Sequence, residues 1–172
     1  YFSSELKALR SHVADVRELP PGKTFSSKHD VHEFPAYKTQ TPLPALNDAK
    51  QAARAVRKTL WDATMRRMND SAVGGVALSG GLDSAIIAAV ALQIDPRLRL
   101  FTVGIDGSPD MHYARLVAKH LNAEDRHDIF LVTTKQIQKA VRDAIWFLES
   151  FEEDCVSGCI ANMFASKLAA KH

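Results

Sequence analysis

The residues best suited to chemistry form one short stretch, Leu78-Ser79-Gly80-Gly81-Leu82-Asp83-Ser84. Its two adjacent glycines carry no Cβ atoms, so several backbone N–H groups can converge on one anion. The apolar run before the glycines predicts a strand, and the apolar run after them predicts a helix, whose positive N-terminal end favours a phosphate group. Ser79 and Ser84 can add hydroxyl donors. The pattern therefore predicts a phosphate-binding turn between a strand and a helix.

Asp83 is the acidic member of this stretch and is poorly suited to contact a phosphate directly. A carboxylate beside bound phosphates is most useful when a divalent cation lies between them. Mg²⁺ is the ion we expect, because it prefers oxygen ligands that it shares with phosphate. Asp83 is thus a candidate Mg²⁺ ligand that acts through the bound pyrophosphate group.

Two common nucleotide-binding signatures, G-x-x-x-x-G-K-[ST] and G-x-G-x-x-G, do not describe this turn. Residues 79–84 instead resemble S-G-G-x-D-S, the pyrophosphate (PP) loop of the ATP pyrophosphatases. A glycine pair after a strand is more often a plain turn, so the prediction depends on the match of the whole hexapeptide. The resemblance implies an adenine nucleotide alpha hydrolase-like fold. It also implies cleavage of ATP between the α and β phosphates and transfer of adenylate to an acid or amide oxygen.

The composition is that of an ordinary globular chain: 172 residues, 46% hydrophobic and 24% charged, with room for one core. The formal charge is only +2, and basic residues do not cluster beyond Arg66-Arg67, so we expect no nucleic-acid partner. No apolar run reaches the roughly 18 residues of a membrane span, and the start lacks the pattern of a secretion signal. We therefore expect no membrane partner and, by default, a cytoplasmic protein. Cys155 and Cys159 are expected to be small buried apolar residues.

The elements that must position the turn follow from the periodicity of apolar residues. Residues 1–37 contain short β-compatible pieces and indicate the edge of a β-rich domain, and residues 38–44, with Pro42 and Pro44, are a candidate linker. Strands are expected at residues 76–78, 98–105 and 127–132. Helices are expected from Asn47 to about residue 70, over residues 85–92, from Ser108, from Thr133 and at the end of the chain.

This alternation of strands with helices predicts an α/β fold, in which right-handed crossovers build a parallel sheet that helices cover on both faces. Three strands are few, because sheets usually have about four to six. We therefore expect this chain to be a fragment of a longer protein.

Several motifs together resemble the glutamine-hydrolysing asparagine synthetase family, class B. Residues 2–9 are similar to the family's F-A-S-E-x-K-A-L segment and residues 19–22 to its F-P-P-G turn. Residues 73–84 are similar to V-P-x-G-V-x-L-S-G-G-L-D-S, and residues 101–104 followed by 108–110 are similar to F-x-V-G followed by S-P-D. The resemblance implies that residues 1–40 are the C-terminal edge of an N-terminal-nucleophile glutaminase domain plus a linker. It implies that residues 41–172 are an incomplete ATP-binding asparagine synthetase domain.

The resemblance also implies site residues, with Ser79 and Asp83 as catalytic residues. In the family, the residue that matches Leu78 and the main chain at the position of Val103 hold the adenine ring. Ligands of parallel α/β sheets lie beyond the carboxyl ends of strands, where the loops after Leu78 and Val103 are expected. The full set of expected ATP-binding residues is Leu78, Ser79, Gly80, Gly81, Leu82, Asp83, Ser84, Val103 and Gly104.

The implied reaction starts with attack of an acceptor carboxylate on the α phosphate of ATP, which gives an acyl adenylate and releases pyrophosphate into the loop. Ammonia then displaces AMP and leaves an amide. Such a first step depends on positioning and charge neutralisation by Mg²⁺ and the loop donors. In the family the acceptor is aspartate, and the ammonia comes from glutamine hydrolysed by the glutaminase part of the same chain. A homodimer is a further expectation.

The chain departs from the family's pattern at three points. The first residue is Tyr1, so no N-terminal cysteine nucleophile is present, and the second phosphate motif, S-G-E-G-x-D-E, is missing. Ser157 and Ala161 occupy the places where the family usually has an arginine and a proline. Since arginine is the natural clamp for a carboxylate, the acceptor is open to other acids.

The expected acceptor-binding residues are Glu149, Asp154 and Ser157, although such acidic residues also serve as solvated helix ends. Two alternative functions follow from these departures. One is a related amidotransferase, or a lactam- or amide-forming enzyme, that acts on a different carboxylate. The other is a module that binds ATP without turning it over.

Overall fold

The computed structural model describes residues 1–26, 30–33, 48–69 and 74–172, which belong to two compact units, residues 1–47 and 48–172. The expected linker at residues 38–44 and the expected helix cap at Asn47 lie outside the described residues.

The first unit contains a short 3-10 helix, η1 (Leu6–Ala8), and an antiparallel hairpin of β1 (Lys23–Ser26) and β2 (Asp30–Glu33). The hairpin begins at a tight turn in which the Lys23 N–H donates to the Pro20 carbonyl over 3.2 Å, and Gly22 takes a positive φ of 75°. Proline followed by a positive-φ glycine is the pattern of a type II turn. The short β-strands expected in this part of the sequence are therefore confirmed.

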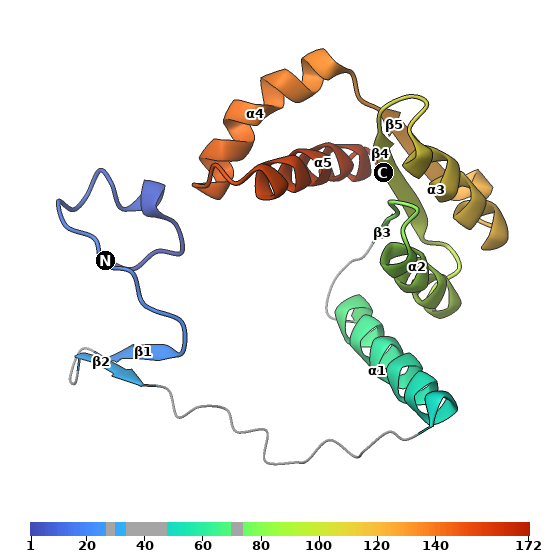
Figure 1. Ribbon diagram of the computed structural model, residues 1–172, viewed down its shortest axis with the longest axis horizontal. Helices are drawn as coiled ribbons and strands as arrows, with labels where there is room; N and C mark the ends of the chain where they lie inside the picture. Colours follow the sequence, from blue (N-terminus) through green and yellow to red (C-terminus); the bar gives the residue numbers. More distant parts are fainter. Residues whose placement is uncertain (27–29, 34–47, 70–73) are drawn as a thin grey trace. The chain divides into compact units, whose positions relative to one another are not determined.

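The second unit alternates strands and helices, as the periodicity predicts (Figure 1). Its strands are β3 (Gly75–Ala77), β4 (Arg99–Gly104) and β5 (His127–Leu131). Its helices are α1 (Ala49–Asn69), α2 (Leu82–Ile94), α3 (Pro109–His120), η2 (Glu124–Arg126), α4 (Thr134–Leu148) and α5 (Glu153–Ala169). The strands form a parallel sheet in the order β3-β4-β5, so the expected α/β fold class is confirmed.

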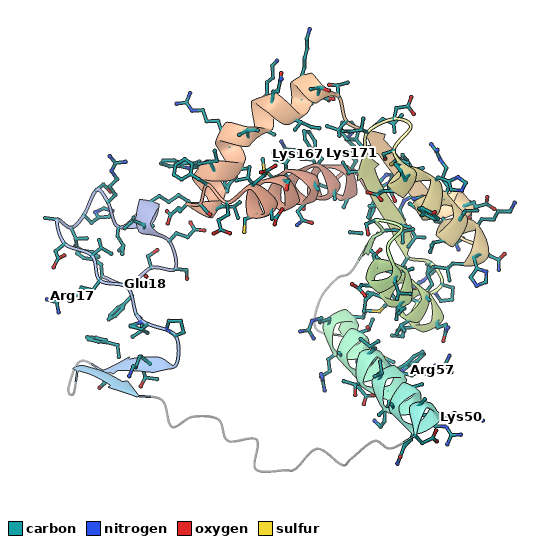
Figure 2. The ribbon with its side chains drawn as sticks, viewed as in Figure 1. Arg17, Glu18, Lys50, Arg57, Lys167 and Lys171 are labelled. Atoms are coloured by element: carbon teal, nitrogen blue, oxygen red, sulfur yellow. The ribbon has the colours of Figure 1, made fainter. Side chains whose placement is uncertain are left out.

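Helices flank this sheet on both faces. Leu100 of β4 is fully buried in a core cluster with small residues of α2 and α3, among them Ala88 and Ala114. The next residue, Phe101, points to the opposite face, where its ring lies 5.9 Å from that of His172 after α5. On that face Phe130 of β5 stacks on Phe164 of α5. Lys167 and Lys171, which are labelled in Figure 2, lie over these two rings.

An ion pair joins β4 to β5 on the α5 face of the sheet. Arg99 donates from Nε to Oδ2 of Asp128 over 2.6 Å and from Nη2 to Oδ1 over 2.9 Å. Hydrogen bonds from Arg99 hold the pKa of the Asp128 carboxyl below its ordinary value. Nε2 of His172 lies 3.5 Å from Oδ1 of the same carboxylate.

The helix starts agree with the sequence at α4 and differ in one detail at α3. The helix expected from Thr133 begins with a capping box: the Gln136 N–H donates to Thr133 Oγ1, and the Thr133 N–H donates to Gln136 Oε1. Ser108 is the N-cap of α3, but its hydroxyl makes no capping hydrogen bond. It is directed toward Gly104 and is buried with no hydrogen-bond partner.

Two burial predictions are wrong. Apolar residues recur along α1 at the spacing of an amphipathic helix, which predicts a buried stripe, but the first half of this stripe is exposed: 57% of Val56 is accessible, whereas Leu60 and Ala63 are partly buried. Cys155 is exposed and Cys159 is partly buried, since only one of them faces α4. Within the described part of the chain, no helix is long and apolar enough to cross a membrane.

The histidine at the start of β5 makes the local stability of the sheet depend on pH. Burial lowers the pKa of His127 below its ordinary 6.5, and Arg115 also lowers it while Asp128 raises it. The opened state therefore binds a proton that the folded state resists, and the free energy of opening β5 should fall as pH drops below about 6.5. Hydrogen exchange of the β5 amides at pH 7 and pH 5, corrected for intrinsic rates, measures this change.

The control is His127→Gln, which keeps an N–H donor and removes the titrating ring. Its opening free energy should be flat between pH 7 and pH 5, because the lowered pKa of Asp128 acts near pH 4 and below. An equal pH dependence in the variant and the wild type would contradict the prediction.

Candidate functional site

The candidate site is the turn that joins β3 to α2. Leu78 follows β3, and its side chain is 1% exposed in the core between the sheet and the two helices α2 and α3. Its N–H donates to the Phe101 carbonyl over 2.8 Å, which extends the parallel ladder by one residue. The residue from which the turn leaves the sheet, Leu78, is therefore held in place by its side chain and its main chain.

Gly80 is the residue on which the path of this turn depends. Its φ is +87°, a left-handed conformation that side chains rarely adopt. A Cβ at this position would lie 2.6 Å from the backbone nitrogen of Ala114 and 2.8 Å from the carbonyl oxygen of Asp110. Glycine is thus required both for the conformation and for the close approach of the turn to the main chain of α3.

The hydroxyl groups of Ser79 and Ser84 make hydrogen bonds within the turn. The Oγ atoms of Ser79 and Ser84 lie 2.9 Å apart, and Ser84 Oγ donates to the Gly81 carbonyl over 3.1 Å. Ser84 Oγ also accepts from the Ser79 N–H over 3.2 Å, and Ser79 Oγ accepts from the Gly81 N–H over 3.3 Å. The two expected hydroxyl donors are therefore brought together at the start of α2.

The start of α2 is open to a ligand. Its N-cap is Gly81, which has no side chain to cap the helix, and the first N–H groups of a helix have no partner within it. Asp83 lies in this first turn and is exposed, as is Leu82. The site thus offers backbone N–H groups, two hydroxyls and one carboxylate at the positive end of a helix.

The side-chain oxygen atoms of the turn fit a Mg²⁺ ion that is also bound by phosphate. Asp83 and the serines supply only oxygen atoms, which are the ligands that Mg²⁺ prefers. The described residues contain no group of three or more His, Cys, Asp or Glu that could hold a metal ion. An ion beside Asp83 would therefore take most of its ligands from phosphate oxygens and water.

Val103 and Gly104 lie at the same edge of the sheet as the turn. They end β4, where Val103 pairs with Phe130 and Gly104 pairs with Leu131. A Cβ on Gly104 would collide with the Sδ atom of Met111, so a side chain at this position would push against α3. The ends of β3 and β4 thus place two groups of expected ATP-binding residues next to each other.

The expected acceptor-binding residues lie elsewhere, at the turn between α4 and α5 (Figure 1). Glu149 ends α4 with a left-handed φ of 54°, and Asp154 lies in the first turn of α5. Ser157 Oγ donates to the Glu153 carbonyl over 2.8 Å. α5 meets the sheet near its C-terminal end, and its 17 residues span about 25 Å. The α4–α5 turn therefore lies at the end of α5 that is remote from the sheet.

Sequence reasoning missed two residues at the base of the turn: Thr102, which contacts Leu78, and His127, which contacts Thr102. Thr102 Oγ1 donates to the carbonyl oxygen of Leu78 over 2.7 Å, and the same Oγ1 lies 2.7 Å from Nε2 of His127. The available signals were a threonine inside an apolar strand and a histidine at the start of another. Neither signal indicates that the two residues, 25 positions apart, meet at Leu78.

Comparisons with known proteins identify the family of this chain. A model of the asparagine synthase family matches residues 55–172. Asparagine synthetase [glutamine-hydrolyzing] 2 of Arabidopsis thaliana is 31% identical over 166 residues, and asparagine synthetase B [glutamine-hydrolyzing] of Escherichia coli K12 is 30% identical over 166 residues. Each alignment covers 88% of this chain. A probable asparagine synthetase [glutamine-hydrolyzing] of Dictyostelium discoideum is 28% identical over 187 residues and covers 97% of it.

Among solved structures, the NH3-dependent NAD synthetase of Campylobacter jejuni matches with a TM-score of 0.47 and 20% identity, over 69% of this chain and 51% of that one. The chain spans only 28 to 33% of the length of the three curated relatives. The family match nevertheless covers most of the chain and includes the turn, both strand ends and α5. The chain therefore belongs to the asparagine synthase family.

Proposed function

We propose that the full-length protein forms an amide at the expense of ATP. In this proposal it adenylates aspartate, releases pyrophosphate, and aminates the acyl adenylate with glutamine-derived ammonia to give asparagine. The observation that carries the proposal is the turn at residues 79–84, where Gly80 brings two serine hydroxyls to the open N-terminus of α2. Membership of the asparagine synthase family supports the same reaction class.

The residues of the turn act on the leaving group. Ser79, Ser84 and the first N–H groups of α2 would bind the β and γ phosphates, so that negative charge develops against fixed donors. Asp83 would hold Mg²⁺ against those phosphates. When bound, Mg²⁺ supplies positive charge that stabilises the departing pyrophosphate. The chain thus contributes positioning and charge neutralisation, with no covalent protein intermediate.

The adenosine part of ATP would lie beside the end of β4. In the proposal, the main chain of Val103 and Gly104 holds the adenine ring. The side chain of Leu78 is buried in the core and its N–H is bonded to Phe101, so Leu78 would contribute through its carbonyl oxygen, which can accept a second hydrogen bond. The two strand ends then hold the base and the phosphates of a single ATP molecule.

In the proposal, the acid that accepts adenylate would be bound by Glu149, Asp154 and Ser157. An acceptor role for these residues requires the α4–α5 turn to approach the residue 79–84 turn in the full-length protein. One observation favours a different acid as acceptor: the Ser157 hydroxyl donates to carbonyls of its own helix, so this position offers no cationic clamp for aspartate. A related amidotransferase with another carboxylate substrate is therefore the second candidate.

The same proposal includes partners and a compartment. Ammonia would come from a glutaminase part of the full-length protein, of which residues 1–40 would be the C-terminal edge and linker. Residues 41–172 would be part of the synthetase domain. The protein would act in the cytoplasm and would assemble as a homodimer.

The test of the proposed function is ATP–pyrophosphate exchange by the full-length protein with labelled pyrophosphate, Mg²⁺ and a panel of acids. Exchange that depends on aspartate is expected. Exchange with another acid alone would assign the protein to the second candidate function. ATP binding without exchange for any acid would contradict both and favour a non-catalytic ATP-binding module.

Removing the carboxylate of the turn should abolish most of this activity. Asp83→Asn keeps the size of the side chain and removes the charge that holds Mg²⁺, so the exchange rate should fall by about 100-fold or more. Asp143→Asn, an equal change at an exposed position of α4, is the control and should exchange at the wild-type rate. Wild-type exchange by Asp83→Asn would remove this residue from the proposed mechanism.

Gly80 should tolerate no side chain. Gly80→Ala places a Cβ against the main chain of α3 in a left-handed conformation, and its melting temperature and ATP affinity should both fall. The matched control is Gly158→Ala in α5, where a Cβ meets nothing within 4 Å. That change should stabilise the helix by about 0.5–1 kcal/mol. Calorimetry with and without ATP compares the two variants, and equal behaviour would refute the prediction.

A further inference from the structure

A chain of two hydrogen bonds reaches the base of the residue 79–84 turn from the neighbouring strands. Thr102 lies inside β4 with 2% of its surface exposed, and its Oγ1 is 2.7 Å from the Leu78 carbonyl oxygen. His127 lies at the start of β5, and its Nε2 is 2.7 Å from the same Oγ1. The first distance is the usual one for an O–H···O hydrogen bond, and the second lies at the short end of the range for N–H···O. One hydroxyl therefore joins the first residue after β3 to the first residue of β5.

The direction of each hydrogen bond follows from a count of protons. The Leu78 carbonyl can only accept, so the single proton of the Thr102 hydroxyl is used in that bond. Thr102 Oγ1 must then accept from His127, which requires a proton on Nε2. The neutral imidazole is thereby confined to its Nε2–H tautomer. Burial lowers the pKa of His127, which favours this neutral form.

The position of the accepting carbonyl links this contact to the phosphate turn. Leu78 directly precedes Ser79, whose hydroxyl and N–H both contact Ser84. The Leu78 N–H is fixed by the Phe101 carbonyl over 2.8 Å, so both polar groups of this residue are held by β4. The Leu78 carbonyl and the Ser79 N–H belong to the same peptide unit, so rotation of that unit would turn the Ser79 N–H away from Ser84. The orientation of the turn thus depends on the Thr102 hydroxyl.

We propose that Thr102 and His127 are positioning residues, which fix the Leu78 carbonyl and so hold the residue 79–84 turn in the orientation that binds the pyrophosphate part of ATP. This role rests on the proposed function of that turn. Neither residue touches the ligand: Thr102 acts through Leu78, and His127 acts through Thr102. His127 supplies a donor of fixed direction, which keeps the Thr102 hydroxyl aimed at the carbonyl.

A purely structural role makes different predictions from a positioning role. Threonine in a strand core can stabilise the fold simply by filling space and satisfying one carbonyl. In that case its loss would lower the melting temperature and leave the kinetic constants of the folded protein unchanged. A positioning role requires that the kinetic constants change in protein that is fully folded.

The kinetic experiment compares Thr102→Val with Thr102→Ser in the full-length protein. Valine has the shape of threonine without the hydroxyl, and serine keeps the hydroxyl. We expect kcat/KM for pyrophosphate in ATP–pyrophosphate exchange to fall about tenfold in Thr102→Val and to return to within about twofold of wild type in Thr102→Ser. Thr59→Val, which removes a hydroxyl-to-carbonyl bond in exposed α1, is the matched control and should leave exchange unchanged.

The second measurement does not depend on activity. In protein labelled with ¹⁵N-histidine, the ring nitrogens of His127 should show a protonated Nε2 and an unprotonated Nδ1, and Thr102→Val should release this preference.

Variants of His127 test its role through exchange activity. His127→Gln keeps an N–H donor and should exchange close to wild type, whereas His127→Phe should lower kcat/KM in the direction of Thr102→Val.

The outcomes separate the two proposals. Wild-type kinetic constants in folded Thr102→Val, or an Nδ1–H tautomer of His127, would overturn the positioning role. Absence of exchange by the wild type with every acid would instead overturn the proposed function. The ATP affinities of wild type and Thr102→Val, measured by calorimetry, would then decide the positioning role, and equal affinities would refute it.

Discussion

The close approach of Gly80 to the main chain of α3 is the contact on which the site depends. The turn after β3 can run beside Asp110 and Ala114 only because no Cβ intervenes, and only a residue that accepts a φ of +87° can make that bend. The same turn brings Ser79 within reach of Ser84, and the next residue, Gly81, leaves the start of α2 without a side-chain cap. The absence of a Cβ at Gly80 thus links the packing of α2 and α3 to the donors of the proposed phosphate site.

The sheet supports this turn through polar contacts as well as through its core. Parallel order places the ends of β3 and β4 at one edge, and α2 and α3 are seated on the face that contains Leu100. The main chain of Leu78 is then held twice by β4, once through its N–H and once through its carbonyl. If the turn binds phosphate as proposed, contacts that are already formed before the ligand arrives would lower the entropy lost on binding.

Much of this arrangement could be predicted from the sequence because it is local. The strand, turn and helix around residues 79–84 follow from adjacent residues, and so does the capping box at Thr133. The contact between Thr102 and His127 could not be predicted, because it depends on the register of two strands that pair Leu100 with His127. The exposure of Val56 also escaped prediction, since helical periodicity indicates an apolar face but not what covers it. The position of Ser157, in the part of α5 that is remote from the sheet, follows from the length and direction of that helix. A motif match contains neither.

The ion pair between Arg99 and Asp128 has a consequence for how the sheet assembles. Successive residues of a strand point to opposite faces, so a slip of β5 by one residue would carry Asp128 to the α2–α3 face and leave Arg99 without its carboxylate. The slipped sheet would bury an acidic side chain among the alanines of that face, a substantial penalty. Correct alignment of β5 is therefore favoured by charge as well as by hydrophobic patterning. Errors of strand pairing are penalised whether or not the residue 79–84 turn has formed.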